Sequence, residues 1–142
     1  MFDKINIMLD DGAYIPTRAH KSDAGLDLYT PIDFTLGSNC EIIIDTGVHV
    51  EIPDGYVGMI KSKSGLNVKA SIRSEGVIDS GYTGSIVVKL YRDGSSGTFL
   101  KFNKGDKISQ LVILPIVTPE PVLVDCFKET ERGSNGFGST GS

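Results

Sequence analysis

The sequence is poor in the residues that mark several common classes of protein. It has no tryptophan, two cysteines and two histidines among 142 residues. The spacing of Cys40 and Cys126 matches no metal or redox motif, and two isolated histidines cannot form a histidine-rich metal cluster. Unpaired thiols are typical of a reducing compartment, so we expect a soluble cytoplasmic protein without a structural disulfide.

Positive charge and long apolar runs are also scarce. The chain carries 14 Lys and Arg against 18 Asp and Glu, a net charge of −4. General nucleic-acid binding needs a basic face, so we expect no nucleic-acid partner. No apolar run approaches the roughly 20 residues of a membrane-spanning helix, and residues 1–12 are too acidic for a signal peptide. We therefore expect no membrane partner, and an anionic ligand only where positive groups or a divalent cation gather locally.

What the sequence does have is frequent punctuation by glycine and proline. Seventeen glycines and six prolines separate short apolar runs, which we interpret as about a dozen strands with room for one short helix. Strands are expected at residues 5–8, 24–31, 56–61, 98–102, 107–115 and 122–125, with residues 41–45 and 48–52 forming a pair. The pattern is typical of an all-β fold, a jelly-roll-like barrel or sandwich.

Residues 76–91 resemble a β-hairpin. Val77 and Ile78 favour a strand, Ser80 and Gly81 mark a turn, and residues 85–91 form the expected return strand. Asp79 then lies at the end of the first arm, where a carboxylate can act as a general base, and Tyr82 offers a flat wall for a ring. On these residues alone, a solvated aspartate beside a tyrosine that only packs is also consistent with the pattern.

Three further segments place polar residues beside or within apolar strands, where they could bind a ligand. Ser64 and Gly65 follow a strand, and free N–H groups at a short helix start, with a hydroxyl and Lys63, suit a phosphate; a capping serine is the alternative. Gln110 interrupts the apolar run 107–115, whose composition predicts burial on both sides, so it either satisfies backbone groups or lines a site. Asp27 is expected to face outward, opposite Leu26, Leu28 and Ile32.

The composition changes near the end of the chain. We expect one β domain over residues 1–126 and a mobile, Gly/Ser-rich tail over residues 127–142. Arginine binds phosphate, phenylalanine stacks on rings, and glycines allow close backbone approach. The tail could therefore close over a phosphorylated ring compound, through Arg132, Phe137, Ser139 and Thr140, or be a plain disordered end.

Five segments together are similar to one known family. They are AGLDLY at residues 24–29, KSGL at 63–66, GVIDSGYTG at 76–84, GDKISQL at 105–111 and RGSNGFGSTG at 132–141. In this order, and over nearly the whole chain, they resemble the motifs of the homotrimeric all-β dUTP diphosphatases (dUTPases).

The resemblance implies an activity and a set of roles. These enzymes hydrolyse dUTP, with Mg²⁺ on the triphosphate, to dUMP and diphosphate, which lowers dUTP and supplies dUMP for dTTP synthesis. Asp79 matches the residue that activates the attacking water, and Gln110 the one that helps hold water and phosphate. Tyr82 matches the tyrosine that packs on the deoxyribose. The backbone of Gly76 and Ile78 would read uracil, and Asp27 would reach the metal through water.

The resemblance also implies how the triphosphate is held. The phosphate chain would contact Lys63, Ser64 and Gly65, and the γ-phosphate would be held by the tail residues Arg132, Ser139 and Thr140. Gly138 would also bind the substrate. Phe137 would cover the base. Each site in the family draws on three subunits, so a homotrimer is expected.

Several positions depart from the family pattern, and two other functions remain open. Lys63 replaces a usual Arg and loses its bidentate fork, Asn135 replaces a usual Gly, and Arg73 lies near a usual Asn. Tyr91 or Phe99 could share the lid role. The alternatives are a dCTP deaminase-like enzyme of the same fold and a nucleotide-gated module that binds a protein.

Overall fold

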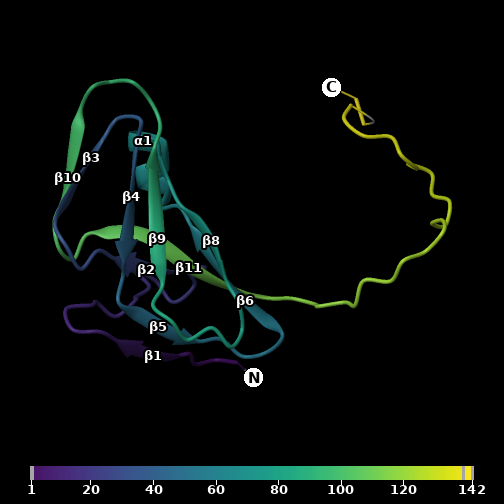
Figure 1. Cartoon of the computed structure of the whole chain (residues 1–142), viewed down its shortest axis with the longest axis horizontal. Helices are drawn as coiled ribbons and strands as arrows, with labels where there is room; N and C mark the ends of the chain where they lie inside the picture. The colour runs from purple at the N-terminus through teal and green to yellow at the C-terminus, as the bar shows by residue number, and fades with distance from the viewer. Residues whose placement is uncertain (1, 139, 142) are drawn as a thin grey trace.

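Antiparallel strands make up most of the protein. The structure is a computed structural model that describes residues 2–138, 140 and 141. Those residues form eleven strands and one helix (Figure 1), which confirms the expected all-β fold with a single short helix. The elements are β1 (Asn6–Leu9), β2 (Gly25–Tyr29), β3 (Phe34–Gly37), β4 (Cys40–Asp45), β5 (Val48–Glu51), β6 (Tyr56–Lys61), α1 (Ser64–Ala70), β7 (Ile72–Arg73), β8 (Glu75–Ile78), β9 (Val87–Arg92), β10 (Phe99–Phe102) and β11 (Lys107–Pro115).

The largest sheet has four strands, in the order β2-β11-β6-β8. The strand predicted at residues 107–115 is confirmed as β11 and lies between β2 and β6. Gln110 lies opposite Asp27 of β2 on one side and opposite Lys61 of β6 on the other. This sheet therefore brings three segments with expected functional residues side by side.

The predicted burial of β11 on both sides holds for its first half. Ile108, Ser109 and Leu111 are buried, whereas Leu114 and Pro115 at the far end are exposed. A bulge between Lys107 and Ser109 shifts the register with β2 at the start of the strand. Such bulges re-aim side chains, so strict alternation cannot describe this part of the strand.

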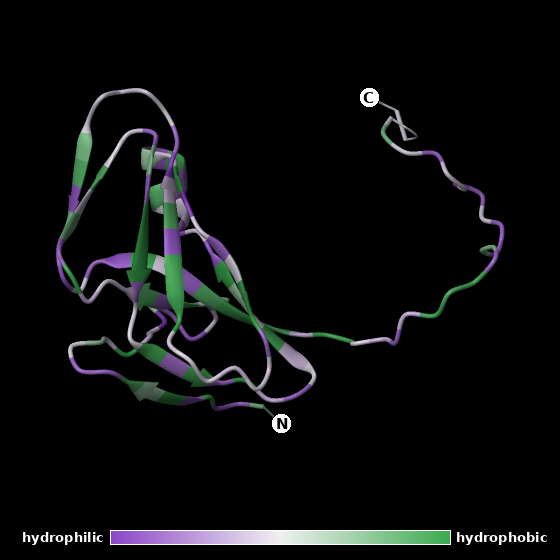
Figure 2. Cartoon of the chain, viewed as in Figure 1, coloured by the Kyte–Doolittle hydropathy of each residue, from purple (hydrophilic) through white to green (hydrophobic). Residues whose placement is uncertain are grey.

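The remaining strands form three smaller sheets, β1-β5, β10-β3 and β4-β9-β7, and no closed barrel forms within the described part of the chain. One apolar cluster joins them to the large sheet. Strand β9 shows how it is built: Val88, Leu90 and Arg92 are buried and alternate with outward residues. Burying each such aliphatic side chain stabilises the fold by about 1.5–3 kcal/mol. Figure 2 shows the hydrophobic segments running along the strands of the body.

The predicted pairing of residues 41–45 with residues 48–52 is wrong. β4 pairs with β9, and β5 pairs with β1. Between them Gly47 adopts a φ of 67°, and buried Thr46 donates both its N–H and its hydroxyl to the carbonyl of Ile86. The chain thus crosses from one sheet to another at this point and does not form a hairpin.

The predicted hairpin at residues 76–91 has its turn but not its pairing. The N–H of Tyr82 donates to the carbonyl of Asp79 at 3.2 Å. However, β8 pairs with β6, while β9 pairs with β4 and β7. β7 lies in the sheet of β9, and at buried Ser74 the chain passes from that sheet to β8 in the large sheet. The two arms, β8 and β9, therefore belong to different sheets.

Two other expectations are wrong. Ile32 is 46% exposed, because it lies in the turn after β2 and not in the strand. Residues 122–125 form no strand; Val122 and Leu123 in this stretch are exposed. After β11 the chain leaves the body and runs away from it as an extended arm (Figure 1). A strand needs a neighbour for its backbone groups, and the arm has none within the described chain.

None of the described residues belongs to a helix with the length and apolar character needed to cross a bilayer.

Candidate active site

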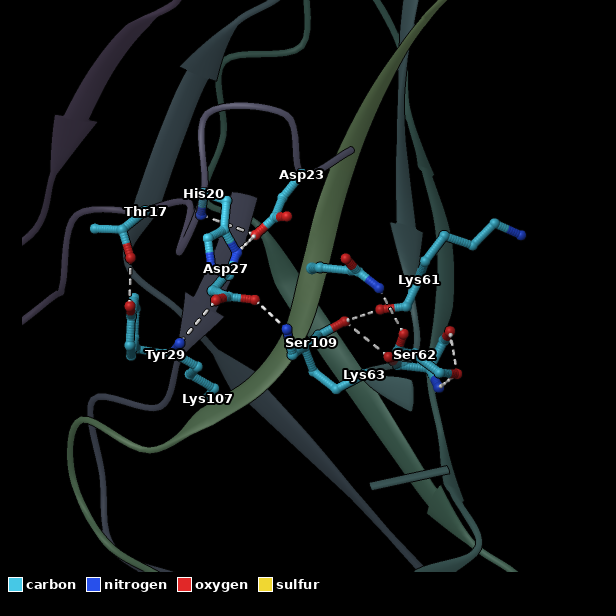
Figure 3. A network of polar contacts seen from close by, with 12 residues as sticks. Thr17, His20, Asp23, Asp27, Tyr29, Lys61, Ser62, Lys63, Lys107 and Ser109 are labelled. Carbon is cyan, nitrogen blue, oxygen red and sulfur yellow. Dashed lines mark hydrogen bonds and ion pairs between the residues drawn. The ribbon is translucent and has the colours of Figure 1, made fainter. Parts of the chain in front are cut away.

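A buried carboxylate between two lysines is the centre of the site. Asp27 lies on β2 with its side chain 6% exposed. Lys63 donates to Oδ1, and Nζ of Lys107 lies 3.0 Å from Oδ2 (Figure 3). Burial alone would raise the pKa of Asp27, but the hydrogen bonds and charges of the two lysines outweigh it and lower that pKa. Asp27 is therefore a charged, buried group, and its predicted outward orientation is wrong.

The two lysines reach Asp27 from different elements. Lys107 begins β11 and pairs with Tyr29 of β2, and its hydrogen bond to Asp27 raises the pKa of Lys107. Lys63 follows β6 and is the N-cap residue of α1. Sequence reasoning gave Lys107 no role, because its proximity to Asp27 depends on a bulged register that no local pattern reveals.

Gln110 is half-buried beside this carboxylate. Its Nε2 donates to the carbonyl of Ser62 at 2.8 Å. The expectation that this amide satisfies a backbone group is therefore confirmed. On the other side, the amide lies against Gly25, where an added Cβ would come within 2.1 Å of Oε1. The side chain is thus held between two backbone segments.

Three serines fix the strands around Gln110, and none was predicted from the sequence. The N–H of Ser74 donates to the hydroxyl of Ser62 at 3.0 Å. The hydroxyls of Ser74 and Ser109 lie 2.7 Å apart, and the Ser109 hydroxyl donates to the carbonyl of Lys61 at 2.9 Å. These bonds join β6, β11 and the point where the chain switches from β7 to β8.

The start of α1 is exposed beside the carboxylate. Lys63 occupies the N-cap without a side-chain cap bond, so the alternative of Ser64 as a capping residue is wrong. Ser64 and Gly65 are the exposed first residues of the helix. A pocket of about 480 Å³ is lined by Gly65, by four apolar side chains, and by four lysines: Lys63, Lys69, Lys101 and Lys107. Such clustered positive charge attracts anions even though the net charge of the chain is negative.

The turn after β8 holds the second group of expected residues. Asp79 and Tyr82 are both exposed. The hydroxyl of Tyr82 donates to the carbonyl of Ser85 at 3.0 Å, which folds the ring over Gly84. A Cβ at Gly84 would lie 2.4 Å from that hydroxyl, so a larger residue here would displace the Tyr82 ring from this place. The backbone of Gly76 and Ile78 belongs to β8, an edge strand of the large sheet.

Within one chain, Asp79 and Gln110 are kept apart. In the β6–β8 ladder Ile78 pairs with Gly58 at one end, whereas Lys61, the partner of Gln110, lies at the other. Four residues of strand separate the levels of Asp79 and Gln110, a span of roughly 13 Å. The chain therefore brings together Asp27, Lys63 and Gln110, and leaves the turn of Asp79 and Tyr82 at the opposite end of the sheet.

The expected tail residues lie farther away still. Arg132, Phe137, Gly138 and Thr140 are exposed, on the arm that extends from the body in Figure 1. Hydrogen bonds here join residues close together in the chain: for example, Nε of Arg132 donates to the carbonyl of Asn135 at 3.0 Å. Ser139 lies outside the described residues.

A metal ion would have few protein ligands here. Among the residues that the structure describes, no group of three or more His, Cys, Asp or Glu side chains gathers to hold a metal. Both oxygens of Asp27 already accept from lysines. The donor set fits a hydrated Mg²⁺ held mainly by a bound phosphate chain, because Mg²⁺ usually keeps several waters.

Comparison with known proteins gives consistent matches over most of the chain. The dUTPase family model matches residues 11–141. A deoxyuridine 5'-triphosphate nucleotidohydrolase of Mycolicibacterium gilvum is 39% identical, with 95% of this chain and 92% of the relative covered.

Solved structures agree with these relatives. The dUTPase of Staphylococcus bacteriophage 80alpha, with dUPNHPP, has a TM-score of 0.89 and 32% identity, and the match covers 99% of both chains. A mutant dUTPase from phage phi11 of S. aureus, which coordinates a structural Mg(II) ion, has a TM-score of 0.81 and 31% identity, covering 89% of this chain and 100% of that one.

Proposed function

Because this chain belongs to the dUTPase family, we propose that it hydrolyses dUTP to dUMP and diphosphate, which lowers dUTP and supplies dUMP for dTTP synthesis. The observation that carries the proposal is the gathering of four lysines around the pocket at Gly65, two of which also contact the buried Asp27 beside Gln110. A triphosphate needs such a local gathering of positive charge on an acidic protein. Relatives named for dUTP hydrolysis favour this reaction over dCTP deamination.

The chemistry requires a water molecule, a base and a phosphate holder. Asp79 accepts a proton from the water while the water oxygen attacks the α-phosphorus. The bond from the α-phosphorus to the oxygen that bridges it to the β-phosphorus then breaks, and diphosphate leaves. Gln110 holds the water and the phosphate through its amide. Lys63, Ser64 and Gly65 bind the phosphate chain, where ammonium and N–H groups oppose the charge that develops on oxygen.

Recognition of the nucleoside falls to β8 and the turn after it. Since β8 is an edge strand, it carries backbone groups that are not used in a ladder, and these are the groups that a base edge can bind. The backbone of Gly76 and Ile78 reads uracil. Tyr82 packs on the deoxyribose and leaves no space for a 2′-hydroxyl, so UTP is rejected.

A bound Mg²⁺ would supply positive charge that offsets the charge of the phosphate oxygens. Asp27 would help to hold the ion through its water shell, because both carboxylate oxygens already accept from lysines.

The active assembly is a homotrimer in which sites are shared between copies. Two observations support this. Asp79 and Gln110 lie at opposite ends of the large sheet, Asp79 in the turn after β8. The arm after β11 exposes apolar side chains, which mark an interaction surface: Val117, Val122, Leu123 and Phe127. We assign residues 1–126 to the β domain and residues 127–142 to a mobile tail. In the tail, Arg132, Ser139 and Thr140 bind the γ-phosphate, Gly138 also binds the substrate, and Phe137 covers the base.

The cytoplasm is the proposed location. Cys40 and Cys126 are both exposed and free, as expected of thiols in a reducing compartment.

The test is diphosphate release from dUTP with Mg²⁺, with dCTP, dTTP and UTP as controls. Asp79→Asn should lower kcat by about 10²- to 10⁴-fold, the usual contribution of a general base, and should leave dUTP binding intact. Asp54→Asn is the matched control, because Asp54 is an exposed aspartate in another turn. Normal turnover by Asp79→Asn would show that the base lies elsewhere, and ammonia release from dCTP would indicate a deaminase.

A further inference from the structure

His49 bridges two hydrogen-bond acceptors from distant parts of the chain. It lies on β5 with its side chain 23% exposed. Its Nδ1 is 2.7 Å from the carbonyl oxygen of Thr83, and its Nε2 is 3.0 Å from Oδ1 of Asp10. A neutral imidazole carries one N–H and a protonated ring carries two. Because both partners are acceptors, the two bonds form together only when His49 is an imidazolium.

The charges around this ring favour that form. Asp10 faces it from the turn after β1, Asp45 from the end of β4, and Glu51 lines the same small pocket from β5 itself. The carbonyl of Thr83, and then the carboxylate of Asp10, raise the pKa of His49 above 6.5. Histidine is the side chain whose ordinary pKa lies nearest physiological pH, so the charge of His49 is the one near this turn that a change of pH can alter.

The contact anchors the turn that carries Asp79 and Tyr82. Beyond Tyr82, the segment is attached to the body at two side chains: Ser85 donates to Asp45, and the carbonyl of Thr83 accepts from His49. Regular pairing resumes at Ile86, whose N–H donates to the carbonyl of Val48 at 2.8 Å. The bond to His49 is thus the attachment nearest to Tyr82, and it adjoins that residue directly in the chain.

We propose that His49 is a positioning residue of the reaction: as an imidazolium it fixes the carbonyl of Thr83 and so sets the position of the Tyr82 ring against which the sugar packs. This inference rests on the proposed function. When His49 loses its proton, only one ring nitrogen still carries a hydrogen. Either the Thr83 carbonyl or the Asp10 carboxylate then faces a lone pair, and that hydrogen bond is lost. The affinity for dUTP then falls, while the proton transfer at Asp79 is affected less.

A structural test needs no activity. In NMR titrations of the full chain without nucleotide, the His49 ring should titrate with a midpoint above 6.5. The amide of Gly84, which shares a peptide group with the Thr83 carbonyl, should shift with the same midpoint. Asp10→Asn should lower that midpoint. A Gly84 amide that does not follow the titration of His49 would overturn the proposal.

A kinetic test separates positioning from a purely structural role. For the wild-type protein, the KM for dUTP should rise roughly three- to tenfold as pH increases through the His49 midpoint, the size expected from the net contribution of one hydrogen bond, with kcat changed less than about twofold. His49→Ala should show the raised KM at every pH. His49→Gln, which keeps one N–H donor arm, should be intermediate and pH-independent.

The matched control is His20→Gln, because His20 is the other histidine and pairs with Asp23 in an exposed loop. It should keep the wild-type KM profile. Thermal unfolding of each variant shows whether a raised KM reflects misfolding. A wild-type KM for His49→Ala in a folded protein would refute the proposal. A wild-type protein that does not hydrolyse dUTP would refute the proposed function instead, and the NMR titration would still decide whether His49 holds Thr83.

Discussion

Gln110 and Gly25 lie so close across the β2–β11 ladder that no side chain at residue 25 can coexist with the glutamine in its present place. A Cβ at Gly25 would lie 2.1 Å from Oε1 and 2.9 Å from Cδ of Gln110. The glutamine is held from its other side by its bond to the Ser62 carbonyl. The absence of a side chain at Gly25 on β2 therefore leaves the space into which the amide of Gln110 points from β11.

Gly25→Ala should consequently impair turnover more than folding. The added methyl group forces Gln110 out of its place, and overpacking of this kind typically costs about 1–3 kcal/mol of stability. We expect kcat for dUTP to approach that of Gln110→Ala. In the double variant, removal of the amide should recover most of the lost stability and none of the lost activity. Full activity in Gly25→Ala would mean that the position of Gln110 is not important for catalysis.

The contacts of Lys63 and Lys107 with Asp27 should stabilise the fold in a way that depends on pH. Asp27→Asn removes the charge that both lysines oppose, and we expect a loss of about 1–3 kcal/mol, below the usual range for a buried ion pair because the lysine heads are partly exposed. Urea unfolding at fixed protein concentration measures this loss. Asp23→Asn, at an exposed aspartate nearby, should change stability by less than about 1 kcal/mol.

The pH dependence of that difference has a definite sign. The folded-state pKa of Asp27 is lowered below 3.8, so the stabilisation is fully present above the unfolded pKa and is lost as pH falls through the folded one. The wild-type protein and Asp27→Asn should therefore differ by a constant amount above about pH 5 and converge below 3.8. A difference that disappears between pH 5 and 7 would contradict the assignment.

The fold was predictable from the sequence as far as local pattern reaches. Glycine and proline spacing located most strands, and the apolar run 107–115 is β11 to the residue. Which strands pair with one another was harder to predict, because pairing depends on the sheet that each strand joins. Residues 41–45 and 48–52 are adjacent in the chain yet lie in separate sheets, and the switch at Ser74 depends on buried contacts with Ser62 and Ser109.

The site was predictable where residue type carries the chemistry. Asp27 and Gln110 lie together on neighbouring strands, and Lys63 reaches them from the start of α1. Lys107 and His49 were missed, since a lysine at a strand start and a histidine within a strand are ordinary until the register shows what they face. The position of Asp79, away from Gln110, follows from the register of β8 on β6 and of β6 on β11, which no local pattern reveals.

Removal of the tail should separate folding from catalysis. The body ends with β11, and the arm beyond it has few contacts with the rest of its own chain, apart from the N–H of Ile116 to the carbonyl of Gly55 at 2.8 Å. Deletion of residues 127–142 should leave the unfolding midpoint within a few degrees of the full-length value and lower kcat/KM by at least about tenfold, because Arg132 and Phe137 are lost. Circular dichroism and steady-state kinetics measure the two effects. Unfolding of the shortened chain would instead make the tail part of the fold.

Sharing of sites between copies can be tested by mixing two inactive variants. Asp79→Asn keeps an intact phosphate-binding end, and Gln110→Ala keeps an intact turn at the other end of the sheet. If the turn of one copy works on phosphates held by another, mixed trimers contain some sites with both functional residues. Unfolding and refolding the variants together should then restore a sizeable part of wild-type activity, whereas each variant refolded alone should remain inactive. The masses of the refolded assemblies show how freely the copies exchange, because the two variants differ in mass. Failure of the mixture to recover activity, although mixed assemblies have formed, would place Asp79 and Gln110 of one chain in the same site.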